Sequence, residues 1–262
     1  MTDYTKDEYI DQREVLDKGF VKFVSYEGDV YKILRAARIS TGGVASKGEK
    51  QDKGLLRYLY KNQHLTPFEQ ISLTFDVKMP HSIAKQWLRH RGFSPNEYSL
   101  RYSEAIDEMY MPIVWRKQGE KNHQGSGDPF DYHQNMKISG IAEEAYDKCL
   151  IVYNYLISQG VAREQARFVL PLANYTMLTF TTDLRNLLHF LELRLHSHAQ
   201  HEIRVYAEAI HDMLKCVDDF GWIIEIFDEF NSLGNLYHDA INKETNTEKL
   251  KKLLYDFTQG TE

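Results

Sequence analysis

Apolar residues recur along this chain with two periods, one typical of strands and one typical of helices. Between residues 71 and 77 every second residue is apolar, which predicts a strand with one buried face. A similar pattern predicts a strand over residues 19–26, and the polar residues before it are expected to form a short arm. Residues 175–182, rich in Thr, Phe and Tyr, predict a third strand.

Helical spacing and capping residues predict helices between these strands. Asp29 is expected to cap a helix over residues 30–39, and a second helix is expected over residues 51–62. Pro80 favours the first turn of a short helix that ends near Leu88.

Two long helices are predicted in the second half of the chain. Apolar residues keep helical spacing from 138 to 156, and Gly160 is expected to end that helix. Asp183 is expected to cap a helix with one apolar stripe from 184 to 210, and a lysine-rich helix is expected near 247–257. Strands mixed with long helices, without regular β-α-β alternation, predict an α+β fold with a central, mostly antiparallel sheet flanked by long helices.

The chain is expected to form a single domain with a C-terminal helical extension. Its 262 residues suffice for one well-buried core and a small appendage, and we place the domain at 1–219 and the extension, of unknown role, at 220–262. The N-terminal segment lacks the apolar run of a signal peptide, and no stretch approaches the roughly 20 apolar residues of a membrane span. A cytoplasmic location without membrane association is therefore expected.

Charge and cysteine content narrow the possible functions. The formal net charge of −6 argues against a protein that coats nucleic acid, so clustered arginines indicate local anion sites. The two cysteines, Cys149 and Cys216, do not form a disulfide framework. Cys149 falls on the apolar stripe of its helix, and Cys216 lies among Leu214 and Val217, far in sequence from the polar clusters, so neither is expected to have the electropositive surroundings that activate a thiol. Catalysis through a cysteine nucleophile is not expected.

The strongest candidate site is the segment RHRGFSPNEYSLRY, residues 89–102. Its arginines offer rigid donor forks that suit phosphate, and Ser99 and backbone N–H groups can complete an anion cage around Gly92 and Pro95. Residues 97–103 are expected to be extended, which would put three side chains on one face: Glu97, Ser99 and Arg101. The alternative is a solvated basic turn with local ion pairs.

A second polar cluster borders the apolar stripe between residues 183 and 202. On one continuous helix, the 100° spacing puts Arg194, His198 and His201 on one edge and Arg185, His189 and His196 on the other. The histidines lack an HExxH arrangement and supporting carboxylates, so no metal site is predicted. We expect structural or solvated roles for His196 and His211.

Two further motifs are weak when taken alone. Residues 64–69, HLTPFE, form a Thr-Pro turn that needs no function. Arg163 and Arg167 lie one helical turn apart, and they could contact a phosphate or form an exposed ion-pair edge.

Taken together, these motifs resemble the blocks of the flavin-dependent thymidylate synthases. The family pattern is Arg-His-Arg, seven residues, then Ser, which here is RHR at 89–91 and Ser99. HLTPFEQ, AREQARFVLP and DLRNLLHFLELR…HAQHEIR resemble further blocks of that family in the same order, and the resemblance covers residues from about 20 to 215.

The resemblance implies a reaction and an assembly. It implies that dUMP is converted to dTMP in de novo dTMP biosynthesis, with 5,10-methylenetetrahydrofolate as carbon donor and NADPH reducing bound FAD. It also implies a homotetramer with active sites shared between subunits, and no enzyme nucleophile. The protein would supply binding, orientation and electrostatics, while the cofactor supplies the hydride.

The resemblance also implies site residues. Those for dUMP are Gln86, Trp87, Leu88, Arg89, Glu97, Tyr98, Ser99, Leu100, Arg101, Arg167 and Arg194. Those for FAD are Thr66, Arg89, His90, Arg91, Asn96, Glu97, Asp183, Leu184, Arg185, His189 and His198, with His64 and Glu69 as further candidates. Arg194 is the implied catalytic residue, at the uracil edge, where its cation would favour ionisation of N3.

Two other classes of protein remain as alternatives at this point. The arginines of residues 89–101, with Tyr98 and Tyr102 for base stacking, would suit a single-stranded RNA-binding module. The histidines of residues 189–201 would suit a metal-dependent nucleotide hydrolase.

Overall fold

The computed structural model describes residues 9–119 and 126–242. The chain divides into two compact units, the first formed by Met1–Glu27 and Ile71–Met213 and the second by Gly28–Gln70 and Leu214–Glu262. Each unit is described by itself below. The domain boundary expected between residues 219 and 220 stays a prediction.

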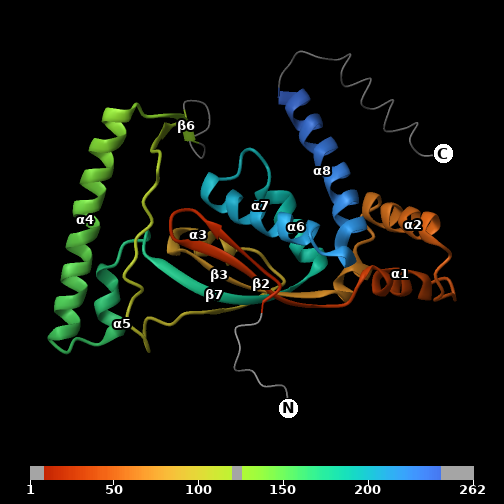
Figure 1. Cartoon of the computed structure of the whole chain (residues 1–262), viewed down its shortest axis with the longest axis horizontal. Helices are drawn as coiled ribbons and strands as arrows, with labels where there is room; N and C mark the ends of the chain where they lie inside the picture. Colours follow the sequence, from red (N-terminus) through yellow and green to blue (C-terminus); the bar gives the residue numbers. More distant parts are fainter. Residues whose placement is uncertain (1–8, 120–125, 243–262) are drawn as a thin grey trace. The chain divides into compact units, whose positions relative to one another are not determined.

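The first unit is built on a five-stranded antiparallel sheet in the order β1-β2-β3-β7-β4 (Figure 1). Its strands are β1 (Asp11–Val15), β2 (Gly19–Glu27), β3 (Ser72–Pro80), β4 (Phe93–Glu97) and β7 (Tyr175–Asp183). The expectation of a polar arm before β2 is wrong for residues 11–15. They form the edge strand β1, because a strand paired on one side only tolerates polar side chains.

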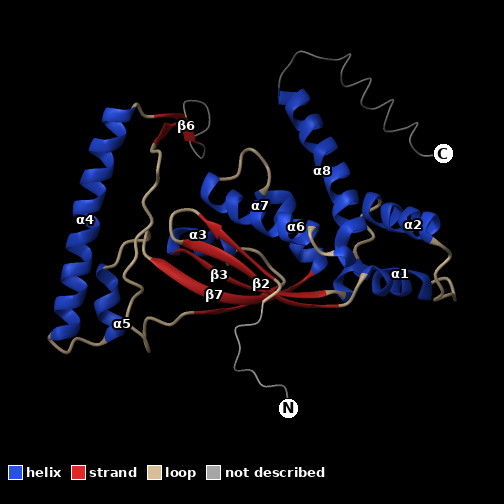
Figure 2. Cartoon of the chain, viewed as in Figure 1, coloured by secondary structure: helices blue, strands red, loops and turns tan. Residues whose placement is uncertain are grey.

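One face of the sheet carries the core and is covered by helices (Figure 2). Alternate residues of the two central strands are buried, among them Phe75 of β3 and Phe180 of β7. These helices are α3 (His81–Trp87), α6 (Leu184–Arg194) and α7 (His201–Lys215). Trp87 contacts the rings of Phe180, Phe190 and Tyr206 with centroid distances of 5.4, 4.5 and 6.2 Å. The α+β fold predicted from the sequence is confirmed.

Helices α3 and α6 each begin directly at the end of a strand. Pro80 ends β3 and is also the N-cap of α3. Asp183 ends β7, and its side chain accepts a hydrogen bond from the backbone N–H of Asn186 at 2.9 Å, so it caps α6 as predicted. Both helices therefore begin at the ends of adjacent strands of the sheet.

The prediction of a single long helix over residues 184–210 is wrong. Helix α6 ends at Arg194, residues 195–200 form a turn, and α7 begins at His201. The backbone N–H of His198 donates to Nδ1 of His196 at 3.1 Å, and such local side-chain bonds compete with helical ones. The apolar stripe continues in both helices, which is why periodicity alone did not reveal the break.

The remaining elements of the first unit lie between β4 and β7. They are β5 (Arg116–Gln118), β6 (Ser126–Pro129), α4 (Tyr132–Ser158), α5 (Arg163–Ala166) and the 3₁₀ helix η2 (Arg167–Val169). Strands β5 and β6 form a short antiparallel pair. Gly160, at φ +77°, follows the end of α4 as predicted.

The second unit is helical. It contains α1 (Val30–Ile39), α2 (Glu49–Lys61), η1 (Thr66–Gln70), η3 (Asp218–Phe220) and α8 (Gly221–Asn242). Asp29 caps α1 as predicted, and Arg38 forms a buried ion pair with Asp52 of α2. The helix expected near 247–257 lies outside the described residues. In the part of the chain that the structure describes, no helix combines the length and apolar character needed to cross a membrane.

Candidate functional site

The Arg-His-Arg motif lies where α3 ends and turns into β4. The backbone N–H of Arg89 donates to Gln86 O at 3.3 Å, that of His90 donates to Trp87 O at 3.0 Å, and Gly92 then takes a φ of +78°. The side chains of Arg89 and Arg91 are exposed. Within residues 9–119 and 126–242, neither guanidinium has a hydrogen-bond or ion-pair partner. In a chain of net charge −6, two unpaired cations at one tight turn favour an anionic ligand.

Gly92 brings the two predicted polar clusters into contact. A Cβ atom at this position would lie 2.1 Å from Nδ2 of Asn186, in the first turn of α6. The Asn186 amide is itself held by Asp183, to which Nδ2 donates at 2.6 Å. Only a glycine allows this approach and this φ together. The Arg-His-Arg turn is therefore packed directly on the N-terminus of α6.

Arg194, from the last turn of α6, reaches back to the same motif. Its Nε donates a hydrogen bond to Nε2 of His90 at 3.0 Å, and the His90 ring lies edge-on to Phe190 with centroids 4.9 Å apart. Burial, the charge of Arg194 and the neighbouring His189 lower the pKa of His90 to about 4. A neutral His90 can accept the bond from Arg194 only if its proton is on Nδ1. The structure thus pairs the implied catalytic residue with a motif 104 residues away in the chain.

We expect the His90 ring to titrate near pH 4 rather than near its ordinary value of 6.5. Between these values the unfolded chain binds a proton that the folded chain does not. The contribution of His90 to stability is therefore present above pH 6.5 and is lost as the pH falls towards 4. Titration of the ring by NMR checks this. Because burial is the larger cause, most of the depression should survive in Arg194→Gln, and titration near 6.5 in the wild-type chain would contradict the geometry.

Glu97, at the end of β4, is held as a carboxylate by residues of adjacent elements. Thr176 of β7 donates to it at 2.9 Å, and Nδ1 of His81 lies 3.4 Å away. The hydrogen bond from His81 and that from Thr176 lower the pKa of Glu97, and together with the His81 charge they outweigh the opposing effect of burial. Glu97 therefore adds a fixed negative charge at the end of β4 that lies away from the cationic turn.

Residues 99–103 form a turn, so the extended segment expected over 97–103 is wrong. The backbone N–H groups of Tyr102 and Ser103 both donate to Ser99 O, at 3.1 and 3.0 Å. The alternation that was to place Glu97, Ser99 and Arg101 on one face therefore does not apply. Strand pairing ends at Glu97, and without a partner strand the chain closes its own hydrogen bonds in a turn.

This turn lies beside α5, which brings another predicted motif to the site. Arg101 pairs with Glu164 at 3.5 Å, and Arg163 pairs with Glu104 at 3.4 Å. Arg163 therefore belongs to an exposed ion-pair edge, one of the two possibilities left open by the sequence. Arg167 is half-buried, and its guanidinium has no polar partner among the described residues.

The other implied ligand residues lie in several surroundings. Trp87, Leu100 and Leu184 are core residues, exposed by 1%, 7% and 0%, so only their backbone atoms can reach a ligand. Leu88, Asn96, Arg185, His189 and His198 are exposed, Tyr98 is half-buried with its hydroxyl donating to Glu104 O, and Gln86 donates to Gln200. His64, Thr66 and Glu69 are exposed residues of the second unit. The predicted line of Arg194, His198 and His201 along one helix edge is wrong, because the helix breaks between them.

Several residues that shape the site were not singled out from the sequence. They are His81 and Thr176 at Glu97, Asn186 beside Gly92, and Gln200 with Glu202 behind Gln86. Each acts through a contact with a residue distant in sequence, so no local pattern marks it. Glu202 lies in the first turn of a helix, but the sequence predicted one continuous helix over residues 184–210, so this position carried no signal.

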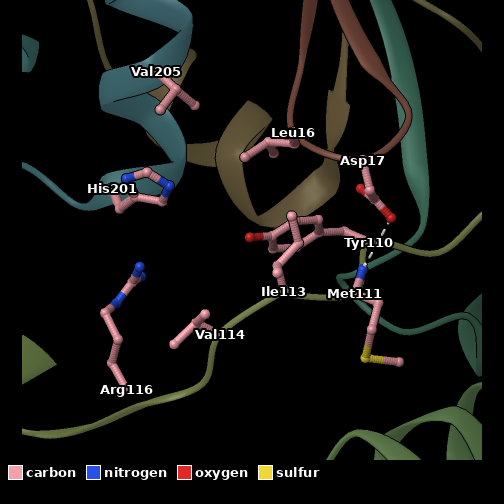
Figure 3. A pocket seen from close by; sticks show the side chains of 9 residues that line it. All are labelled: Leu16, Asp17, Tyr110, Met111, Ile113, Val114, Arg116, His201 and Val205. Carbon is pink, nitrogen blue, oxygen red and sulfur yellow. Dashed lines mark hydrogen bonds between the residues drawn. The ribbon is translucent and has the colours of Figure 1, made fainter. Parts of the chain in front are cut away.

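A cavity of about 350 Å³ opens in the first unit between the β1–β2 turn and α7 (Figure 3). Its mainly apolar lining is Leu16, Asp17, Tyr110, Met111, Ile113, Val114, Arg116, His201 and Val205. Figure 3 shows the Arg116 guanidinium pointing towards the His201 ring. Across the described ranges, no group of three His, Cys, Asp or Glu side chains is arranged to hold a metal ion.

Comparison with known proteins assigns the family. The model of the family described as thymidylate synthase complementing protein matches residues 22–218. The chain is 40% identical to a flavin-dependent thymidylate synthase of Wolbachia pipientis wMel, over 93% of this chain and 84% of that protein. The chain belongs to the flavin-dependent thymidylate synthase family. It is also 42% identical to the flavin-dependent thymidylate synthase of Thermosipho africanus (strain TCF52B), over 85% of this chain and 96% of that protein.

The fold comparison agrees with this assignment. A solved UMP/dUMP methylase from Streptomyces cacaoi, bound with 5-Br dUMP, matches with a TM-score of 0.74 and 32% identity, over 83% of this chain and 97% of that one. The family expected from the RHR segment is confirmed, and with it an enzyme that depends on a flavin. The individual site residues stay predictions.

Proposed function

We propose that this flavin-dependent thymidylate synthase family member converts dUMP to dTMP, with 5,10-methylenetetrahydrofolate as carbon donor and NADPH reducing bound FAD. One observation carries the proposal. Arg89 and Arg91 extend unpaired from a tight turn, and His90 of the same turn accepts a hydrogen bond from Nε of Arg194. The cations proposed for the phosphate and the cation proposed for the uracil ring thus come from a turn and a helix that contact each other. The cytoplasmic location expected from the sequence stays a prediction.

For dUMP, the proposed phosphate contacts are Arg89, Arg101 and Arg167, with Ser99. Supporting this, loop 99–104 and α5 are tied by two ion pairs, so Arg101 and the segment leading to Arg167 lie side by side. The Ser99 hydroxyl accepts the backbone N–H of Arg101 at 3.3 Å, and no basic side chain contacts it among the described residues. A binding role suits this hydroxyl better than a nucleophilic one.

Arg194 would act on the uracil ring. Burial lowers the pKa of its guanidinium, which nevertheless stays cationic at any physiological pH. A partly desolvated cation stabilises negative charge more strongly than one in water, so it would favour ionisation of uracil N3. Neutral His90 fixes the direction of the guanidinium without competing for the charge.

The residues proposed for FAD fit an anionic cofactor. Arg91 has no acidic partner within the described residues, and Asn96 and His189 add exposed hydrogen-bonding groups in the same unit. Exposed donors of this kind suit a diphosphate. When bound and reduced, the flavin supplies the hydride for the transferred carbon. The residues of the chain hold and orient the substrate and set the charge around it.

The homotetramer is also a proposal, supported by helix α4. Every residue of this helix is described, and Tyr153 is its one buried side chain. Ile141, Ile151 and Tyr155 are more than half exposed, as is Phe168 just after α5. Monomeric proteins rarely expose so much apolar surface together, and an interface with other copies of this chain would cover it.

The proposal predicts that the purified protein is yellow and that anaerobic NADPH bleaches it. The bleached protein should then form dTMP when dUMP and methylenetetrahydrofolate are added. Absorbance spectra and product analysis check both steps, and the solution mass of the same sample tests the tetramer. A colourless protein that takes up no FAD would refute this function. Stoichiometric zinc or manganese would instead favour the hydrolase alternative.

A further inference from the structure

A file of three hydrogen-bonded side chains leads from α7 to the end of α3. Glu202, in the first turn of α7, is 5% exposed, and its Oε2 accepts a hydrogen bond from Nε2 of Gln200 at 2.8 Å. Oε1 of Gln200 in turn accepts a hydrogen bond from Nε2 of Gln86. Gln86 lies in the last turn of α3, three residues before Arg89 of the anion-binding turn. The file therefore ends at the proposed nucleotide site.

The carboxylate at the start of the file is held from its other side. Its Oε1 accepts hydrogen bonds from Arg116 at 2.7 Å and from the Tyr110 hydroxyl at 3.2 Å. Burial alone would raise the pKa of Glu202. The bonds from Gln200, from its own amide and from Arg116 outweigh burial and hold the pKa below its ordinary value. Glu202 is thus a fixed, ionised acceptor, and Arg116 and Tyr110 also line the cavity in Figure 3.

An ionised carboxylate determines the direction of every amide that follows it. A carboxylate only accepts hydrogen bonds, so Gln200 must turn its NH₂ group towards Glu202. Its carbonyl oxygen then faces Gln86, which must present its own NH₂ group to Gln200. The carbonyl oxygen of Gln86 is left directed away from the file. Without the charge, both amides could rotate by half a turn and present the opposite polarity.

We propose that Glu202 is a positioning residue for the nucleotide, acting through Gln200 to make Gln86 an acceptor at the binding site. The inference rests on the proposed function, in which Gln86 contacts dUMP. The group recognised would be a hydrogen-bond donor of the nucleotide. In dUMP such donors are the uracil N3–H and the sugar hydroxyl. A ligand that offers only an acceptor at this point would be disfavoured.

The test is dUMP binding by the flavin-loaded protein, measured by calorimetry, with Glu202→Gln. We expect affinity to fall about tenfold, the effect of one misdirected hydrogen bond. If the sugar hydroxyl is the donor, KM for dUMP should rise while kcat at saturating dUMP is preserved, because that contact is equal in the ground and transition states. If N3–H is the donor, kcat should change as well, because N3 loses its proton in the proposed reaction. Glu208→Gln removes the same charge from an exposed position of α7 and should bind dUMP like wild type. Unchanged affinity in Glu202→Gln would overturn the proposal.

A second variant covers the case in which Glu202→Gln does not fold. Gln200→Met removes the middle of the file and leaves the pair of Glu202 with Arg116 intact, and it should weaken dUMP binding equally. In a Gln86→Ala background, Glu202→Gln should have no further effect on affinity. Additive losses would show a merely structural role and overturn the proposal.

Two further measurements identify the donor of the nucleotide and distinguish failure of the Glu202 proposal from failure of the proposed function. If the sugar hydroxyl is the donor, wild type and Glu202→Gln should bind 2′,3′-dideoxyuridine monophosphate equally. If N3–H is the donor, the tenfold difference should persist. A wild-type protein that binds FAD but not dUMP would overturn the proposed function before any substitution is made, so the two failures are distinguishable.

Discussion

Replacing Arg194 by alanine is expected to lower kcat for dTMP formation by about 100- to 1,000-fold, the usual effect of removing one preorganised donor for transition-state charge. Arg194 is the half-buried cation that His90 orients at 3.0 Å, and alanine leaves neither charge nor donor there. The bound-flavin spectrum should remain, because the cofactor contacts proposed for Arg91 and Asn96 are untouched. Single-turnover dTMP formation and the visible spectrum measure the two effects separately.

Arg204→Ala is the matched control for this substitution. Arg204, on α7, is also half-buried, and it pairs with Glu208 at 3.5 Å and donates to Ser197 O in the turn before that helix. The control removes the same charge from the same unit, so it should retain turnover. Wild-type turnover in Arg194→Ala would remove this residue from the mechanism. Loss of flavin together with turnover would indicate that Arg194 acts mainly by holding His90 and its turn.

Gly92→Ala is expected to weaken both flavin and dUMP binding by at least about tenfold, beyond a stability loss of about 1–2 kcal/mol from the positive φ. The new Cβ would overlap Asn186 at 2.1 Å and force its side chain away from Asp183. The cationic turn and the N-terminus of α6 would then shift relative to each other. Titrations with FAD and dUMP and thermal unfolding measure the two effects.

The control for Gly92 is Gly160→Ala. Gly160 has a φ of +77°, and a Cβ there would meet nothing within 4 Å. It should therefore show the same loss of stability and ordinary ligand binding. If the two variants bind FAD and dUMP alike, the contact between Gly92 and Asn186 does not shape the site.

The elements themselves were largely predictable from the sequence. Alternation marked β3, capping by Asp29 and Asp183 marked the starts of α1 and α6, and Gly160 marked the end of α4. These signals are local, because a cap or an alternating strand depends on residues a few positions apart. The errors lay where a local pattern was compatible with two structures. The polar strand β1 and the break after Arg194 are the two clearest cases.

The sequence by itself determined the α+β class and the family to which the chain belongs, and it predicted an anion-binding segment at 89–102. The unusual composition of that segment makes it recognisable without any coordinates. Only the tertiary structure decided which residues meet: Arg194 with His90, Asn186 with Gly92, and Glu202 with Gln86 through Gln200. These contacts arise because β7, entering the sheet between β3 and β4, starts α6 beside the end of α3. Periodicity reports which face of an element is buried but not which element lies against it.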